Sequence, residues 1–93
     1  MRTYEVTFIF RAEEDLYKKG LEFVKAEMAK YGAAVQKEED MGVRTLAYPI
    51  KKQSQGHYTM FTVDFPQDKI SEIEKMLRLQ VEILKYLFIL PEN

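Results

Sequence analysis

The side chains that could take part in chemistry gather in the middle of the chain. One stretch, residues 44–58, contains Arg44, Lys51, Lys52, His57 and Tyr58. Its cations form a local basic patch, although the whole chain has 14 basic and 15 acidic residues and a formal net charge of −1. A near-neutral chain does not bind nucleic acid by bulk attraction alone, so the distribution of charge matters more than its sum. Ordinary solvated charge is the alternative interpretation of this patch.

Catalytic and metal-binding chemistry lack the residues that they need. An enzyme needs a nucleophile beside a base, or carboxylates whose environments separate their pKa values. The chain has one histidine, His57, and no cysteine. The acidic segment Glu38–Asp40 lacks the ligand spacing around a turn glycine that a calcium loop requires, so it predicts a solvated bend. We therefore expect no enzymatic activity, no cofactor and no metal site.

Length and composition predict a single globular domain that spans residues 1–93. The chain has 46% hydrophobic and 31% charged residues, which is typical of a folded protein rather than a disordered one. No apolar run approaches the ~20 residues of a membrane span, and the N-terminal segment lacks the apolar core of a signal peptide. The absence of cysteine excludes a disulfide framework. These features predict a cytoplasmic location with no membrane contact.

The spacing of apolar residues predicts a strand and then a helix in the first third of the chain. Residues 3–10 alternate between two faces, and the core face consists of Tyr4, Val6, Phe8 and Phe10. From Glu13 the period changes to 3.6, with an apolar stripe made of Tyr17, Leu21, Val24, Met28 and Tyr31. Gly32 can supply the left-handed residue that ends this helix.

Residues 43–65 predict a β-hairpin. Its arms are residues 43–50 and 57–65, and the polar connector 51–56 is typical of an exposed loop. Pro49 cannot donate to a strand ladder, which places the first arm at an edge of the sheet. The acidic segment before Gly42 predicts a bend or bulge, so we expect two short strand pieces ahead of the loop.

The last third of the chain predicts a second helix and a final strand. Asp68 is a candidate cap for a helix that ends between Leu79 and Ile83 and whose apolar stripe is Ile70, Ile73, Leu77 and Val81. Residues 84–90 form the final strand. The order β-α-β-β-α-β predicts an α+β, ferredoxin-like fold, in which two helices cover one face of a four-stranded antiparallel sheet. The first and third strands are central, and the other sheet face stays bare.

This fold hosts many functions, so the fold alone does not identify one. A metal carrier would need a cysteine pair in the loop after the first strand, where this chain has Arg11, Ala12 and Glu13. A small-ligand effector domain would need a glycine in the same loop, and there is none. The segment 55–61 resembles the third strand of the RNA-recognition motif only faintly, because most motif positions differ.

A more specific resemblance covers essentially the whole chain. Its elements are MRxYE at the N-terminus, Tyr31-Gly32 at the helix end, the run RTLAYPIKK that starts at Arg44, and the following Gly56-His57-Tyr58. Together these motifs resemble the bacterial small-ribosomal-subunit protein six family. Members of that family resemble the βαββαβ architecture predicted above, and some relatives carry an extended C-terminal tail beyond the position of Asn93.

The resemblance implies a structural component of the bacterial small ribosomal subunit. The partners that it implies are the central domain of small-subunit ribosomal RNA and the eighteenth small-subunit protein, with no small-molecule substrate. Because the net charge is small, we expect tight RNA binding only together with a basic partner. The candidate RNA contacts are Arg2, Tyr4, Arg44, Lys51, Lys52, His57 and Tyr58.

The protein partner is expected on the bare sheet face and on the edge formed by the first hairpin arm, where apolar area remains uncovered. The candidate partner contacts are Ile9, Met60, Thr62, Leu87 and Ile89. The alternative function is a ferredoxin-like homodimeric small-ligand effector domain. Such a domain would use the same surface, so the sequence does not separate the two.

Overall fold

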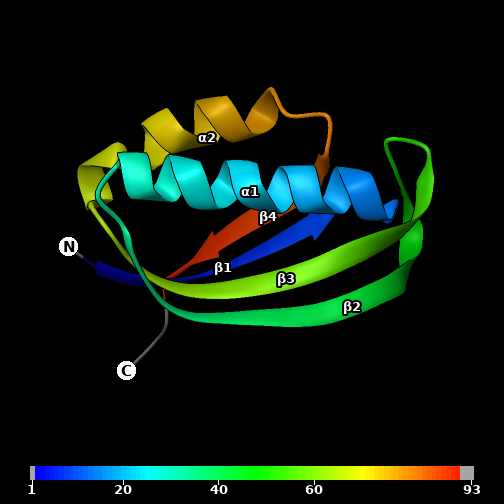
Figure 1. The fold of residues 1–93 in the computed structure, drawn as a ribbon, viewed down its shortest axis with the longest axis horizontal. Helices are drawn as coiled ribbons and strands as arrows, with labels where there is room; N and C mark the ends of the chain where they lie inside the picture. The colour runs from blue at the N-terminus through cyan, green and yellow to red at the C-terminus, as the bar shows by residue number, and fades with distance from the viewer. Residues whose placement is uncertain (1, 91–93) are drawn as a thin grey trace.

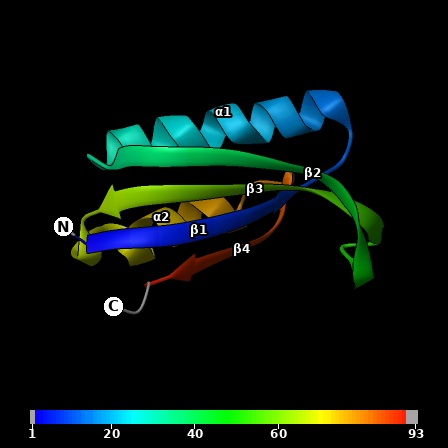
Figure 2. The same cartoon turned by 90° about the horizontal axis from the view of Figure 1, so that it is seen from below.

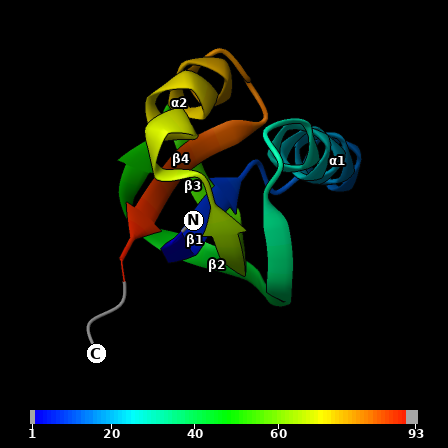
Figure 3. The same ribbon diagram turned by 90° about the vertical axis from the view of Figure 1, so that its left-hand side faces the viewer.

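Four strands and two helices form a two-layer structure (Figure 1). The computed structural model describes residues 2–90. The elements are β1 (Arg2–Phe10), α1 (Glu14–Lys30), β2 (Ala34–Ile50), β3 (Gln53–Phe65), a 3-10 turn (Gln67–Lys69), α2 (Ile70–Arg78) and β4 (Ile83–Ile89). The antiparallel sheet has the order β2-β3-β1-β4, and both helices lie on one of its faces (Figure 3). The predicted ferredoxin-like fold is confirmed, with the first and third strands in the centre.

The core lies between the helices and the face of the sheet that the alternation of β1 predicts. Val6 of β1 pairs with Phe61 of β3, and both side chains are fully buried. The buried residues of this core are Tyr4, Val6, Phe8, Phe10, Tyr17, Val24, Met28, Phe61, Val63, Phe65, Ile73, Leu77 and Ile83. Because successive strand residues point to opposite sides, the core positions on β1 and β3 leave the residues between them on the other face of the sheet.

The helix boundaries follow the sequence more closely for α1 than for α2. Helix α1 ends before Tyr31, and Gly32 has a φ of 80°, as predicted for its left-handed stop. Helix α2 ends at Arg78, so Val81 lies beyond the helix and is 67% exposed. The prediction that Val81 belongs to the apolar stripe of this helix was therefore wrong. Asp68 sits inside the 3-10 turn, which has no side-chain cap, so its predicted capping role was also wrong.

The β2–β3 hairpin is longer than predicted and its turn is shorter. Strand β2 is one continuous element of 17 residues rather than two pieces, and Gln53 already pairs with Ile50. The turn therefore consists of Lys51 and Lys52, whose φ angles are 48° and 65°. Two left-handed residues match the twist of the flanking strands, which is why this geometry joins tight hairpins even without glycine. Residues 53–56, predicted as loop, extend strand β3.

Strand β2 departs from regular pairing at three places. The predicted bulge near Gly42 is confirmed, because the register shifts between Asp40 and Gly42, whose φ is 81°. A second shift lies between Val35 and Lys37. The third separates Thr45 from Ile50, so the segment 46–49 bulges out opposite a single residue of β3. Pro49 belongs to this last bulge, a position where its missing N–H breaks no ladder hydrogen bond.

The two faces of β3 predict different costs for truncation. Phe61 is fully buried, whereas its neighbour Met60 is only half-buried on the other face. Phe61→Ala should lower the free energy of unfolding by about 3–5 kcal/mol, the usual loss for a buried phenylalanine. Met60→Ala is the matched control and should cost less than about 1 kcal/mol. Urea unfolding of both variants checks the assignment, and equal losses would contradict it.

Candidate nucleic-acid interface

The sheet face opposite the helices, called the open face below, is built from three rows of paired residues (Figure 2). Residues that pair across strands share a face, so each row runs from β3 through β1 to β4. The rows are Tyr58–Ile9–Lys85, Met60–Thr7–Leu87 and Thr62–Glu5–Ile89. The first row lies toward the β2–β3 turn, and the third lies toward the end of the sheet where β1 begins and β4 ends.

A small buried cluster covers part of the open face. It consists of Ile9, Leu46 and Leu84, which are 8%, 8% and 5% exposed, with Ile50 and Tyr58 packed against them. Leu46 reaches this position because it belongs to the bulged segment of β2. The predicted exposure of Ile9 was therefore wrong, since the chain's own hairpin covers it. A Cβ at Gly56 would collide with the Ile9 side chain, so this close approach requires glycine there.

Cations and tyrosine rings surround this cluster. The Arg44 guanidinium carbon lies 5.9 Å from the centre of the Tyr58 ring, and the Arg44 Nε donates to the Met41 carbonyl at 3.4 Å. Lys85 stands in the same row as Tyr58, and Lys52 lies in the turn. We call Arg44, Lys51, Lys52 and Lys85 the cationic end. The sequence has no acidic residue in 41–63 or in 83–90, so no carboxylate from either segment neutralises it.

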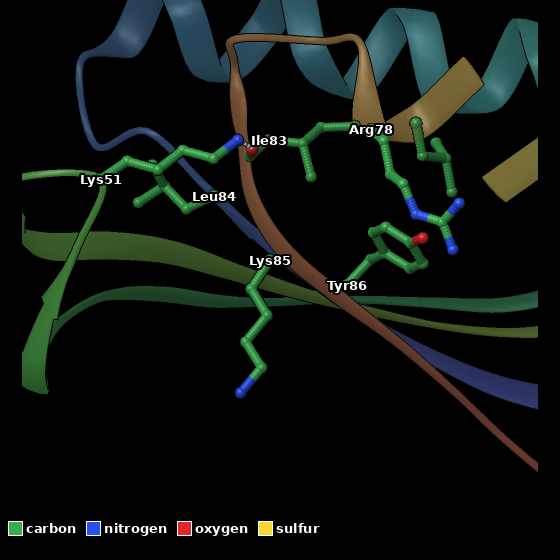
Figure 4. Close-up of a pocket in the computed structure, with 7 residues that line it drawn as sticks. Lys51, Arg78, Ile83, Leu84, Lys85 and Tyr86 are labelled. Carbon is green, nitrogen blue, oxygen red and sulfur yellow. Dashed lines mark hydrogen bonds between the residues drawn. The ribbon is translucent and has the colours of Figure 1, made fainter. Parts of the chain in front are cut away.

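Lys51 differs from the other cations because its tip is already bonded. Its Nζ donates to the Ile83 carbonyl at 3.1 Å, which ties the β2–β3 turn to the start of β4. Figure 4 shows this bond at one side of a pocket of about 380 Å³, with Arg78 and Tyr86 at the other. Lys85 points to the opposite side of the strand from Tyr86, away from the helices. Lys85 thus lines the pocket at its edge while its ammonium group points toward the open face.

His57 lies on the helix side, in contrast to the prediction that it accompanies the lysines. Its ring stacks on Tyr17 with 3.5 Å between centroids and 1° between planes. Its Nε2 lies 2.5 Å from Asp40 Oδ1, and its side chain is only 15% exposed. The hydrogen bond from His57, and then the one from the Gly42 amide, hold the pKa of Asp40 below its usual value. His57 thus joins α1 to the bulge of β2 and lies apart from the lysines, and its contact with RNA remains a prediction.

Comparisons with known proteins agree with this geometry. The family model described as ribosomal protein S6 matches residues 3–89. This chain belongs to the ribosomal protein S6 family. It is 39% identical to small ribosomal subunit protein bS6 of Treponema denticola over 93 residues, which cover 100% of both chains. It is 41% identical to bS6 of Campylobacter lari, covering 100% of this chain and 77% of that one. The structure of 30S ribosomal protein S6 from Thermotoga maritima superposes with a TM-score of 0.81 at 29% identity, covering 95% of this chain and 85% of that chain.

Two predicted RNA contacts of this S6-family chain lie away from the cationic end. Tyr4 is 9% exposed and its ring meets Phe88 edge-to-face at 6.2 Å, so it is a core residue and its predicted RNA role was wrong. Arg2 is exposed but pairs with Phe65, seven residues along β1 from Ile9. At about 3.4 Å per residue, the two positions are roughly 24 Å apart. Arg2 therefore cannot share one phosphate with the cationic end.

The remaining predicted partner contacts do lie on the open face. Met60 and Thr62 are half-buried, and Leu87 and Ile89 are 52% and 45% exposed. Their contact with a protein remains a prediction. Sequence reasoning missed two residues that belong with the cationic end: Lys85, and Tyr48, which is 75% exposed in the bulge. Alternation along the last strand from Ile89 would have placed Lys85 on this face, whereas Tyr48 depends on a bulge that has no sequence period.

The described part of the chain contains neither a candidate metal site nor a helix that could span a membrane. Residues 2–90 contain no group of three or more histidine, cysteine, aspartate or glutamate side chains placed to hold a metal ion. No helix within this range is long and apolar enough to cross a membrane. A second hollow of about 400 Å³ adjoins His57, but the charges that line it are paired, Glu14 with Lys18 at 3.2 Å and Asp40 with His57.

The Asp40–His57 contact predicts an acid-sensitive contribution to stability. Because the pKa of Asp40 is lower in the folded protein than its ordinary value of 3.8, ionised Asp40 stabilises the fold. This contribution is complete above that value and is lost as the pH falls through the folded pKa. Asp40→Asn retains an acceptor for Gly42, so the difference in unfolding free energy between wild type and variant should be larger at pH 7 than at about pH 2.5. A difference that does not change with pH would contradict the assignment.

The two turn lysines should differ in their effect on stability. Lys51→Ala removes the hydrogen bond to Ile83 and should lower the free energy of unfolding by about 0.5–1.5 kcal/mol. Lys52→Ala removes only an exposed side chain and should stay within about 0.5 kcal/mol of wild type. Chemical unfolding of both variants gives the comparison. Equal effects would mean that the Lys51 hydrogen bond carries no stability.

Proposed function

We propose that this chain is a structural component of the bacterial small ribosomal subunit, which binds the central domain of small-subunit ribosomal RNA together with the eighteenth small-subunit protein. Membership of the ribosomal protein S6 family supports the proposal most directly. The role is structural rather than catalytic, and its setting is the bacterial cytoplasm, where ribosomes work. The cationic end of the open face is the part of the described surface best suited to the RNA.

The cationic end suits phosphates because, among the described residues, none of its four cations has a carboxylate partner and only Lys51 has its terminal nitrogen bonded to a carbonyl. Within residues 2–90, neither Arg44, Lys52 nor Lys85 forms an ion pair with a carboxylate. Arg44 is held above Tyr58, so less side-chain freedom is lost when it binds a phosphate. Lys52 and Lys85 add charge on either side of it. Only a few phosphates can be neutralised in this way, so counterion release gives the isolated chain a modest affinity.

Exposed aromatic rings add a second kind of RNA contact beside these cations. Tyr48 stands out from the bulge with 75% of its surface exposed. An unpaired base can stack on such a ring, whereas a base held inside an A-form helix cannot reach it. The cationic end therefore fits RNA in which a phosphate backbone lies close to an unstacked base. Tyr58 is half-buried against the Ile9 cluster, so it positions Arg44 and offers less of its own ring.

The first test compares RNA binding with and without the protein partner. We expect the isolated chain to bind a central-domain RNA fragment weakly at near-physiological salt, and the complex with the eighteenth small-subunit protein to bind it tightly. The small net charge of −1 is the physical reason. Filter binding or fluorescence anisotropy gives both affinities. Nanomolar binding by the isolated chain would contradict the joint mechanism, and failure of the complex to bind would overturn the proposed function.

Removing two cations from the cationic end tests where the RNA lies. Lys52→Gln with Lys85→Gln should weaken RNA binding by the complex and flatten the dependence of log affinity on log salt by about 0.7–0.9 for each phosphate that is no longer neutralised. Lys19→Gln with Lys75→Gln is the matched control, because it makes the same charge change at exposed positions on the two helices. Equal effects of the two pairs would show that only net charge matters.

A further inference from the structure

Glu5 occupies an unusual position for a carboxylate. It lies on β1, one of the two central strands, between Thr62 of β3 and Ile89 of β4. The adjacent row places Met60, Thr7 and Leu87 beside it. Glu5 is half-buried there, and within residues 2–90 its side chain forms no hydrogen bond or ion pair. A half-buried carboxylate that has no partner at the centre of a sheet gains nothing for the fold.

The other carboxylates of the open face have partners. Asp64 accepts hydrogen bonds from Thr3 Oγ1 at 2.6 Å and from Gln36 Nε2 at 2.7 Å. Glu39, which pairs in register with Met60, contacts the Lys37 ammonium at 2.6 Å. In the part of the face that the structure describes, Glu5 is thus the carboxylate left available for an outside cation. It lies four residues along β1 from Ile9, or about 13 Å from the cationic end.

We propose that Glu5 is the recognition group of a protein-docking surface formed with Met60, Leu87 and Ile89, and that it accepts a lysine or arginine side chain of a basic protein. The inference rests on the proposed function, because it assigns the protein partner to one end of the open face. Leu87 and Ile89 supply exposed apolar area beside Glu5, and their exposed fractions are 52% and 45%. Exposed apolar area of this kind is typical of a protein-interaction surface, and a carboxylate within it needs a cation once a partner covers it.

Electrostatics select a protein rather than RNA at this end. Among the described residues, this end of the open face holds three carboxylates, those of Glu5, Glu39 and Asp64, and one ammonium, that of Lys37, so a phosphate backbone would be repelled. A partner that covers Glu5 without a cation would bury an unpaired charge, which is strongly unfavourable. A cation at the right place removes that cost and excludes partners that lack one. The RNA then takes the cationic end, and the two ligands bind one face without overlap.

The experiment measures binding of the eighteenth small-subunit protein to three variants by titration calorimetry. Glu5→Gln keeps the shape and removes the charge, and it should weaken protein binding about tenfold or more and reduce its salt dependence. Glu5→Lys should weaken binding further. Glu22→Gln, at an exposed position of α1, is the charge control and should bind as wild type. Circular dichroism checks that each variant is folded, and Glu5→Gln should melt no lower than wild type.

A charge-reversal screen identifies the cation that Glu5 accepts. Basic residues of the partner are changed to glutamate one at a time and each is tested against Glu5→Lys. One such change should restore most of the affinity that Glu5→Lys removes.

Each outcome has one meaning. If wild type binds the partner and Glu5→Gln binds it equally well, the inference is overturned and the proposed function stands. If Glu5→Gln instead raises the RNA affinity of the isolated chain and leaves partner binding unchanged, this end faces RNA and the inference is also overturned. If wild type binds neither the partner nor the RNA, the proposed function itself fails.

Discussion

The pairing of β1 with β3 is the constraint on which the rest of the structure depends. Val6 opposite Phe61 fixes one face of both central strands inside the core, with neither side chain exposed. A slip of one residue would move every side chain to the other face, so the large apolar area of the core fixes the register. The same register sets the composition of the open face, because Glu5, Met60 and Tyr58 take the positions that the core residues leave. Stability and recognition are therefore set by one alignment.

The bulge in β2 turns this open face into two surfaces. Regular pairing would leave Leu46 and Ile9 as separate exposed side chains, whereas the bulge folds Leu46 onto Ile9 and Leu84. The resulting cluster holds Tyr58 in place, and Tyr58 in turn supports the guanidinium of Arg44. A small amount of apolar burial thus determines where charge is presented. The motif that carries the family resemblance, from Arg44 to Lys52, is the segment that contains this bulge.

Structural features that depend on the local spacing of apolar residues could be predicted from the sequence. Features that depend on contacts between distant segments could not. The order of elements, the core face of β1 and the exposure of Leu87 follow from alternation and helical spacing. The positions of Tyr4 and His57 were mispredicted although the same alternation places both with the core: Tyr4 was offered for stacking, and His57 was grouped with the turn lysines. The burial of Ile9 could not be predicted in this way, because it requires the β2 bulge that carries Leu46 and the close approach of Gly56. The bond from Lys51 to Ile83 joins segments 32 residues apart.

The irregularity of β2 has a consequence for the free protein before it meets any partner. A strand of 17 residues at the edge of a sheet offers a long row of unpaired backbone groups, and such rows recruit strands from other molecules and begin aggregates. Three register shifts divide this row into short pieces, and Pro49 removes a donor from one of them. Lys37 and Glu39 place charges along another. The features that shape the open face therefore also make this edge a poor template for a strand from a second copy of the chain.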